Sequence, residues 1–471
     1  MDGTNGAATV WQRNGRELIP QTAGWAPALS GDLAASAISA ALTVATRLTT
    51  PEVLEQAIAE APRQSAFADR ICWVPHSVAQ GHAGLALLCG YLDACFPEEQ
   101  WDRKARHHLQ RAARAAEAVP ALPLGIFSGV GGLAFAAWQL SRGGERYGRL
   151  LDSLDRSAGV RVIAAARGIR GRQGVSFAEF DAISGLSGVG AYLLCRRGEP
   201  GMFSALTATV EGLVDLLSEG DPLPRWYTPA HLLGDDETRA YCPHGNLNFG
   251  LAHGVPGPLA LLSLAHAAGV AAPGLAEAIA RTADWLCQNR FDDAWGVNWP
   301  AVVPLIETGA ENGGRLQSPG ARAALDGPSR CAWCYGSPGI ARALWLAGEA
   351  LDRKDYRDLA VSAMQAVFRR PVKARRIDSP TFCHGVAGLL AIALRFSHDM
   401  GGAFTGEIAA LVEQLLGSYQ PQSLLGFRHL ETRDNSMDQP GLLEGAPGVA
   451  LALLAAAANA EPTWDRLFLL S

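Results

Sequence analysis

A glycine turn that recurs seven times constrains the fold of this chain more than any other feature. Each copy reads Gly-x-x-Gly and opens an apolar run rich in Ala and Leu. Successive copies are separated by 48, 56, 69, 82, 49 and 60 residues. Self-similarity at such a period indicates a repeat architecture. The first glycines of the seven turns are Gly81, Gly129, Gly185, Gly254, Gly336, Gly385 and Gly445.

The apolar runs that follow the turns are expected to be helices. Leu259, Leu261, Leu262 and Leu264 show no strict alternation, and the surrounding Ala residues favour helix. A unit of about 50 to 60 residues holds two helices of about 11 to 12 residues with their connections. Helices that are apolar nearly all round must be buried on several sides. We therefore predict an all-α fold, an α/α toroid with seven inner and seven outer helices.

If every turn opens an inner helix, all seven turns lie at the same mouth of the toroid. The residue before the first glycine is polar in every copy: Gln80, Ser128, Ser184, His253, Tyr335, His384 and Glu444. Helix N-capping explains the two serines but not His253, Tyr335 and His384. Those three belong to repeats four to six, which predicts chemistry on one side of the mouth. Glu444 is interpreted as a helix cap or a proton acceptor.

Two neighbouring turns also carry soft metal ligands. One turn contains Cys334, and the next contains Cys383 and His384. A catalytic zinc site has three protein ligands and one open position, whereas a structural site has four. Free cysteines are usually small buried hydrophobes, but the shared position in adjacent repeats favours metal binding. Cys331 would close the site as a fourth ligand, which is the less favoured reading.

Bulk properties exclude several classes of protein. The net charge of -6 over 471 residues, with a pI near 6.0, gives no basic footprint for nucleic acid. No stretch approaches the ~18 apolar residues of a membrane span, and residues 1–30 lack a signal-peptide pattern. Nine cysteines, an odd number, do not form a recognisable disulfide framework, and they favour a cytoplasmic location.

The domain organisation is expected to be simple. Residues 1–30 are rich in Gly, Ala, Asn and Gln and are predicted to be a flexible segment. Residues 31–471 are predicted to form a single toroid with insertions at about 219–248 and 290–330. Long excursions on a compact scaffold often line a binding site. Cys242 and His244 are interpreted as insertion residues near the mouth, and His82 as a residue at a helix start.

Seven Gly-x-x-Gly repeats, with a Cys on one turn and Cys-His-Gly on the next, resemble the LanC family of lanthionine synthetase C-like proteins. The resemblance covers roughly residues 75–460. It implies an α/α toroid with one zinc ion at its mouth, held by Cys334, Cys383 and His384. It also implies addition of a peptide cysteine thiol to dehydroalanine or dehydrobutyrine, which forms the lanthionine or methyllanthionine thioether rings of lantibiotics.

The resemblance also implies a set of catalytic residues. The histidine falls on His253, within the motif Asn-Phe-Gly-Leu-Ala-His-Gly that begins at Asn248. The aspartate falls on Asp181, the arginine on Arg330 and the tyrosine on Tyr335. Histidine titrates near working pH, so His253 is the expected acid. The chain carries no extra domain of kinase or lyase size and therefore resembles the standalone cyclase of class I pathways. The implied partners are a dehydrated precursor peptide and the dehydratase and transporter of the pathway.

Three other functions compete with this reading. One is a different zinc enzyme that activates a thiol, either prenyltransferase-like or adding glutathione to dehydrated residues. A second is a non-catalytic, zinc-stapled scaffold that binds a peptide; removing its metal would unfold the chain. The third, glycoside hydrolysis, needs paired carboxylates at the mouth, where the sequence offers mostly imidazoles, thiols and a phenol. The substrate separates the first alternative from the cyclase.

Overall fold

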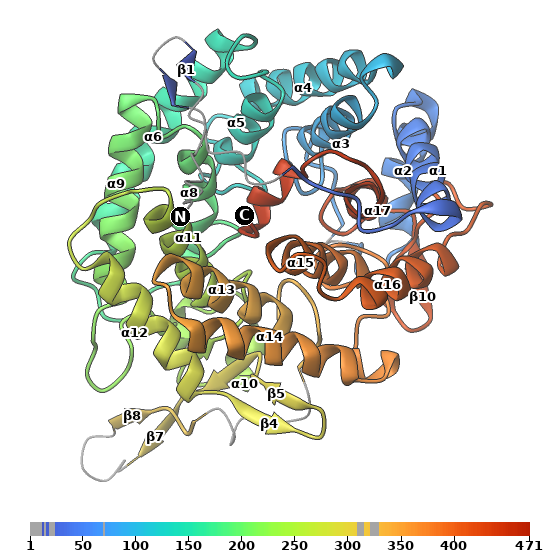
Figure 1. The fold of residues 1–471 in the computed structure, drawn as a ribbon. Helices are drawn as coiled ribbons and strands as arrows, with labels where there is room; N and C mark the ends of the chain where they lie inside the picture. Colours follow the sequence, from blue (N-terminus) through green and yellow to red (C-terminus); the bar gives the residue numbers. More distant parts are fainter. Residues whose placement is uncertain (1–11, 14–15, 18–23, 69–70, 309–314, 321–328) are drawn as a thin grey trace, which may run out of the picture.

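The inner ring of the fold follows the glycine turns. The computed structural model describes residues 12–13, 16–17, 24–68, 71–308, 315–320 and 329–471. Within that part of the chain, an α-helix begins one or two residues after the first glycine of every turn. These seven helices surround a common centre in Figure 1 and confirm the predicted inner ring. They are α3 (His82–Cys95), α5 (Val130–Gln139), α8 (Leu186–Cys195), α11 (Pro256–Ala267), α13 (Ser337–Ala350), α15 (Val386–Asp399) and α17 (Ala446–Ala457).

The outer layer is closed by a helix from the other end of the sequence. Six outer helices each follow their inner partner, but the partner of α17 is α1 (Gly31–Leu48), which leads into α2 (Pro51–Gln64). Outer helices bury one stripe, whereas every residue of α17 is buried. The other outer helices are α4 (Trp101–Glu117), α6 (Gly148–Ile169), α9 (Pro200–Leu216), α12 (Leu275–Gln288), α14 (Lys354–Arg369) and α16 (Thr405–Gly417).

Close backbone approaches explain why both glycines of each turn are needed. In six of the turns, a Cβ on the first glycine would lie 1.6–2.3 Å from a backbone carbonyl oxygen six or seven residues earlier. A Cβ on each second glycine would lie 2.0–3.0 Å from the carbonyl oxygen three residues before the first glycine. At Gly336 the backbone φ of 107° also favours glycine. The loop before each helix therefore folds back tightly against its first turn.

Backbone hydrogen bonds link neighbouring turns around the mouth. The residue two positions before the first glycine donates its N–H to the carbonyl of the equivalent residue in the next repeat. Five such bonds of 2.9–3.2 Å run in series through Ala252, Cys334, Cys383, Leu443, Ala79 and Phe127. We call this series the mouth ladder. It fixes the register between repeats and brings equivalent positions of adjacent turns side by side.

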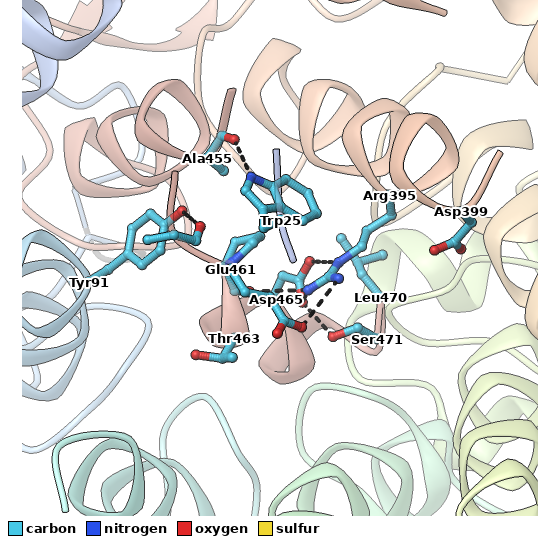
Figure 2. A network of polar contacts seen from close by, with 12 residues as sticks. Trp25, Tyr91, Arg395, Asp399, Ala455, Glu461, Thr463, Asp465, Leu470 and Ser471 are labelled. Atoms are coloured by element: carbon cyan, nitrogen blue, oxygen red, sulfur yellow. Dashed lines mark hydrogen bonds and ion pairs between the residues drawn. The ribbon is translucent and has the colours of Figure 1, made fainter. Parts of the chain in front are cut away.

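The centre of the toroid is filled by the last residues of the chain. The short helix η7 (Thr463–Phe468) lies inside the inner ring, near its centre in Figure 1. The Phe468 ring stacks on Phe382 with 3.8 Å between centroids, and Arg395 pairs with Asp465, with Nη2 and Oδ1 2.8 Å apart. Figure 2 shows this buried ion pair beside Trp25, whose indole N–H donates to the carbonyl of Ala455. Trp25, which lies ahead of α1, therefore packs against the toroid.

The two predicted insertions contain short strands that pair with each other. The first holds η3 (Ala230–Leu232), α10 (Asp236–Tyr241) and β3 (Asn246–Asn248). β3 is antiparallel to β6 of the second insertion. The strands of the second insertion are β4 (Phe291–Asp293), β5 (Gly296–Asn298), β6 (Val302–Pro304), β7 (Ile306–Thr308) and β8 (Arg315–Gln317). Residues 309–314 and 321–328 of that insertion lie outside the described part.

Smaller elements complete the chain. They are β1 (Gln12–Arg13), β2 (Arg16–Glu17), η2 (Pro97–Glu99), α7 (Phe177–Phe180), η6 (Val372–Arg375), β9 (His429–Thr432) and β10 (Asn435–Met437). Most of the predicted flexible segment 1–30 falls outside the described residues. No single described helix has both the length and the apolarity to cross a membrane; α1 and α2 meet those criteria only as a pair, bent by 86°.

Candidate metal centre

Two thiols lie side by side at the mouth of the toroid. The mouth ladder places Cys334 next to Cys383, because the N–H of Cys334 donates to the carbonyl of Cys383 at 3.2 Å. A hydrogen bond from the Cys383 thiol lowers the pKa of Cys334 against the opposing effect of burial, and the Arg330 guanidinium lowers it further. The same bond, together with burial, raises the pKa of Cys383. The two thiols are therefore inequivalent, and Cys334 is the one whose deprotonation is favoured.

An imidazole and a carboxylate adjoin the thiols. Ligand atoms of Cys383, His384 and Glu444 all lie within 4.8 Å of one another. Burial lowers the pKa of His384 to about 4, so its ring is neutral at pH 7 and keeps a lone pair for a metal. Burial raises the pKa of Glu444, and its carboxylate lies 3.8 Å from His384 Nδ1. The His429 ring, from β9, packs edge-on against His384 with 5.4 Å between centroids.

The donor set fits zinc, which binds thiolates, neutral imidazoles and carboxylates. Of the three predicted ligands, Cys383 and His384 belong to the group within 4.8 Å, whereas Cys334 is outside that group and contacts Cys383. The third member of the group is Glu444, for which the sequence predicts a role as a helix cap or a proton acceptor. Its signal was its place in the polar column before the first glycines. Contact across the interface between repeats six and seven, rather than any local motif, brings it to the site.

Other cysteines considered as ligands have different partners. The Cys331 sulfur is buried and accepts a hydrogen bond from Arg370 Nη1 at 3.2 Å. Arg370 is itself held by Asp293 of β4, with 2.6 Å between Nη2 and Oδ2. The Cys242 sulfur accepts a hydrogen bond from the Asn246 amide at 3.7 Å. Cys242 is thus linked to β3, and Cys331 is linked to β4 by way of Arg370.

A histidine and an aspartate form the second part of the site. Asp181 is fully buried at the third turn, and its Oδ1 accepts the backbone N–H groups of residues 183, 184 and 185 at 2.7–3.0 Å. Its Oδ2 lies 2.7 Å from His253 Nδ1. The His253 side chain is 32 % exposed, so its opposite edge faces the mouth. The carboxylate thus fixes a proton on Nδ1 and leaves Nε2 for chemistry.

Tyr335 is positioned by the first insertion. The Asn248 amide at the end of β3 donates to the Tyr335 hydroxyl at 3.1 Å, and Asn248 Oδ1 accepts the Gly250 N–H. A Cβ on Gly250 would lie 2.6 Å from Tyr335 ring atoms, so glycine makes room for the ring. Burial raises the pKa of Tyr335 to about 12, so the hydroxyl keeps its proton. The centroids of the Tyr335 and His253 rings are 6.3 Å apart.

The Asp181 anchor predicts a stability effect. Asp181→Asn replaces one carboxylate oxygen by an NH2 group, so the acceptor of these four hydrogen bonds loses its negative charge. We expect the free energy of unfolding to fall by about 1.5–3 kcal/mol, the usual worth of bonds to a charged group. Urea denaturation measures it. Asp152→Asn, at an exposed position of α6, is the control and should stay within about 0.5 kcal/mol of the unchanged protein. Equal stability of the two variants would contradict the anchor.

Comparisons with known proteins identify the family of this chain. A family model described as lanthionine synthetase C-like protein matches residues 72–469. The nisin biosynthesis protein NisC of Lactococcus lactis subsp. lactis is 26% identical over 364 residues, which are 74% of this chain and 82% of NisC. The solved structure of nisin cyclase matches with a TM-score of 0.70 and 23% identity, covering 88% of this chain and 97% of that chain. Since the family model spans most of its length, the protein belongs to the lanthionine synthetase C-like family.

Proposed function

We propose that this protein is a zinc-dependent lanthipeptide cyclase that acts on a dehydrated precursor peptide. The S–H of a peptide cysteine adds across the Cα=Cβ bond of dehydroalanine or dehydrobutyrine. A bond forms from sulfur to Cβ, the π bond breaks, and a proton goes to Cα. One observation carries the proposal. The mouth of the toroid holds both a pair of adjacent thiols and a histidine, His253, that is fixed by the buried carboxylate of Asp181.

Cys334, Cys383 and His384 are the residues that we propose to hold one zinc ion, with Glu444 beside them. A bound zinc ion would keep a substrate thiol deprotonated at neutral pH, where a free thiol, with a pKa near 8.5, is mostly protonated. The contact between the two protein thiols, the lowered pKa of Cys334 and the neutral His384 ring support this assignment. The three residues come from two adjacent turns that the mouth ladder holds rigidly.

His253 is the proposed acid for the substrate α-carbon. Asp181 holds the proton on Nδ1, so Nε2 is the atom that stores and delivers a proton. Both oxygens of Asp181 already have partners, which favours a direct charge-stabilising role for Arg330 over a role in orienting Asp181. Arg330 is exposed at the mouth and lowers the pKa of Cys334. Tyr335, protonated and partly buried, donates to a substrate carbonyl.

A chelation experiment tests the function. The enzyme is incubated with a dehydrated precursor peptide, and free thiols are counted by alkylation and mass spectrometry. We expect thiols to disappear without a change in peptide mass, because addition within one molecule is an isomerisation. A chelator should stop the loss, and added zinc should restore it.

Glutathione transfer and a zinc-stapled scaffold each give a different result in that experiment. Transfer of a free thiol would raise the mass of the peptide by one glutathione when glutathione is supplied. A zinc-stapled scaffold would lose its helical circular dichroism with the chelator and leave the thiols untouched in every condition. Thiols that persist with zinc and a folded enzyme would contradict the cyclase assignment.

The cellular setting of the enzyme is part of the proposal. All nine cysteines are free thiols, which supports the reducing cytoplasm as its location. A dehydrated peptide requires a dehydratase upstream, and the cyclised product requires export. We propose that dehydratase and a transporter of the same pathway as partners. The toroid of residues 31–471, with its two insertions, is proposed to act as one domain.

A further inference from the structure

A second polar cluster is formed by residues more than 200 positions before the thiol pair in the sequence. A cavity of about 480 Å³ opens between α2, α4 and the start of α3. Its lining contains three histidines and two arginines: His82, His107, His108, Arg111 and Arg114. The volume falls within the range of about 300–1,000 Å³ that is usual for ligand pockets. We call it the α2–α4 pocket.

A chain of hydrogen bonds fixes the protons of the two buried histidines. Arg111 Nε donates to His82 Nε2 at 3.0 Å, and His82 Nδ1 lies 3.1 Å from His108 Nδ1. Burial lowers the pKa of His82 to about 4 and that of His108 to about 3, so both rings are neutral at pH 7. With His82 Nε2 accepting, its proton is on Nδ1 and is donated to His108. The donor left on His108 is Nε2–H, on a side chain that is only 4 % exposed.

The two arginines of this pocket have no ion-pair partner in the described part of the chain. Among the described residues, no carboxylate forms an ion pair with Arg111 or Arg114. Glu55 of α2 is the one acidic residue in the lining of the pocket. The whole protein carries a net charge of -6, so this basic surface contrasts with the rest. An anion bound here gains two guanidinium partners at little cost in broken ion pairs.

The opposite side of the pocket is apolar. Leu48, Leu54 and Ile58 line it from α1 and α2, and Trp73 closes one end. The Trp73 ring packs edge-on against His82 with 5.2 Å between centroids. A small inorganic anion would leave this apolar surface uncovered. The lining therefore matches a group in which a carboxylate stands next to an apolar side chain.

We propose that the α2–α4 pocket anchors an acidic segment with apolar neighbours in the peptide substrate while a thioether forms at the thiol pair. This inference rests on the proposed cyclase function. His82 directly follows the first glycine turn, so the pocket borders the same end of the toroid as the seven turns. It contains none of the residues assigned to the reaction. Anchoring there contributes equally to the bound substrate and the transition state, and so acts on KM and not on kcat.

Paired variants of α4 test the anchor in turnover. Arg111→Gln with Arg114→Gln removes both guanidinium groups from the pocket, and both positions are exposed, so folding is preserved. We expect KM for the dehydrated precursor to rise about tenfold or more, with kcat within about twofold. The matched control is Arg103→Gln with Arg106→Gln, two exposed arginines of α4 outside the pocket. An equal rise in KM for both pairs would show general charge attraction and overturn the proposal.

A binding experiment separates this proposal from the cyclase assignment. The probe is a rhodamine-labelled peptide of alternating Leu and Glu with blocked ends, and its counterpart carries Gln for Glu. Fluorescence anisotropy should show binding of the Glu peptide, loss of that binding in the Arg111 and Arg114 variant, and little binding of the Gln peptide. This readout needs no thioether formation. Equal binding of both peptides, or displacement by inorganic phosphate at matched ionic strength, would overturn the peptide anchor.

Discussion

Replacing Cys334 by alanine is expected to remove zinc and thioether formation together while the toroid stays folded. The change deletes one of the two adjacent thiols at the mouth. Changes to groups that merely hold a ligand in place already cost about 10–100-fold in metal affinity or activity, so losing a ligand should cost more. Zinc per protein chain, measured by mass spectrometry of the metal after dialysis, and the rate of thiol loss from the peptide are the two readouts.

Cys287→Ala is the matched control for this prediction. Cys287 lies on the outer helix α12, is partly exposed and belongs to none of the turns. It should keep one zinc per chain and full activity, and both variants should show the same helical circular dichroism. Stoichiometric zinc in the Cys334 variant would prove the ligand assignment wrong.

Replacing His253 by alanine is expected to have the opposite pattern, with zinc retained and chemistry slowed. A positioned acid contributes about 10²–10⁴-fold to a rate, and we expect kcat to fall by that factor. The reason is that Nε2 is the proposed proton source, fixed by the 2.7 Å contact between Nδ1 and Asp181. The measurement is the rate of thiol loss at saturating peptide, together with the zinc content.

His231→Ala controls for the loss of an imidazole from the surface. His231 is exposed on η3 of the first insertion, and its removal should change neither the rate nor the zinc content. Unchanged kinetics in the His253 variant would exclude it as the acid. Loss of zinc in that variant would instead place His253 at the metal.

The inner ring was predictable because its signal is repeated and local. At each glycine of the seven pairs, a Cβ would lie 3.0 Å or less from a backbone atom, so only glycine fits. The sequence therefore marks the start of every inner helix. The outer helices have no such mark. The helix that pairs with α17 is α1, more than 390 residues earlier, and no periodic feature of the sequence links them. The filling of the centre by η7 was likewise invisible, because its few apolar residues resemble any short buried segment.

The candidate site was predictable to the extent that it follows the columns of the repeat. Cys334 and Cys383 occupy the same column in adjacent repeats, and the mouth ladder turns that shared position into direct contact. Glu444 shares a column with His384, but its approach depends on how repeats six and seven pack. His429 comes from a hairpin outside the repeat, so no column could reveal it.

The pairing of α1 with α17 has a consequence for biosynthesis of the protein on the ribosome. The bond from Trp25 to Ala455 spans 430 residues, and η7 enters the ring only after α17 has been made. Until then α15 and α3 lack α17 between them, and the inner ring lacks the helix that fills its centre. Topologies that depend on such distant contacts fold slowly and expose apolar surface on the way. We therefore expect the nascent chain to leave the ribosome as an open arc of helical hairpins, which closes only when α17 and η7 have emerged.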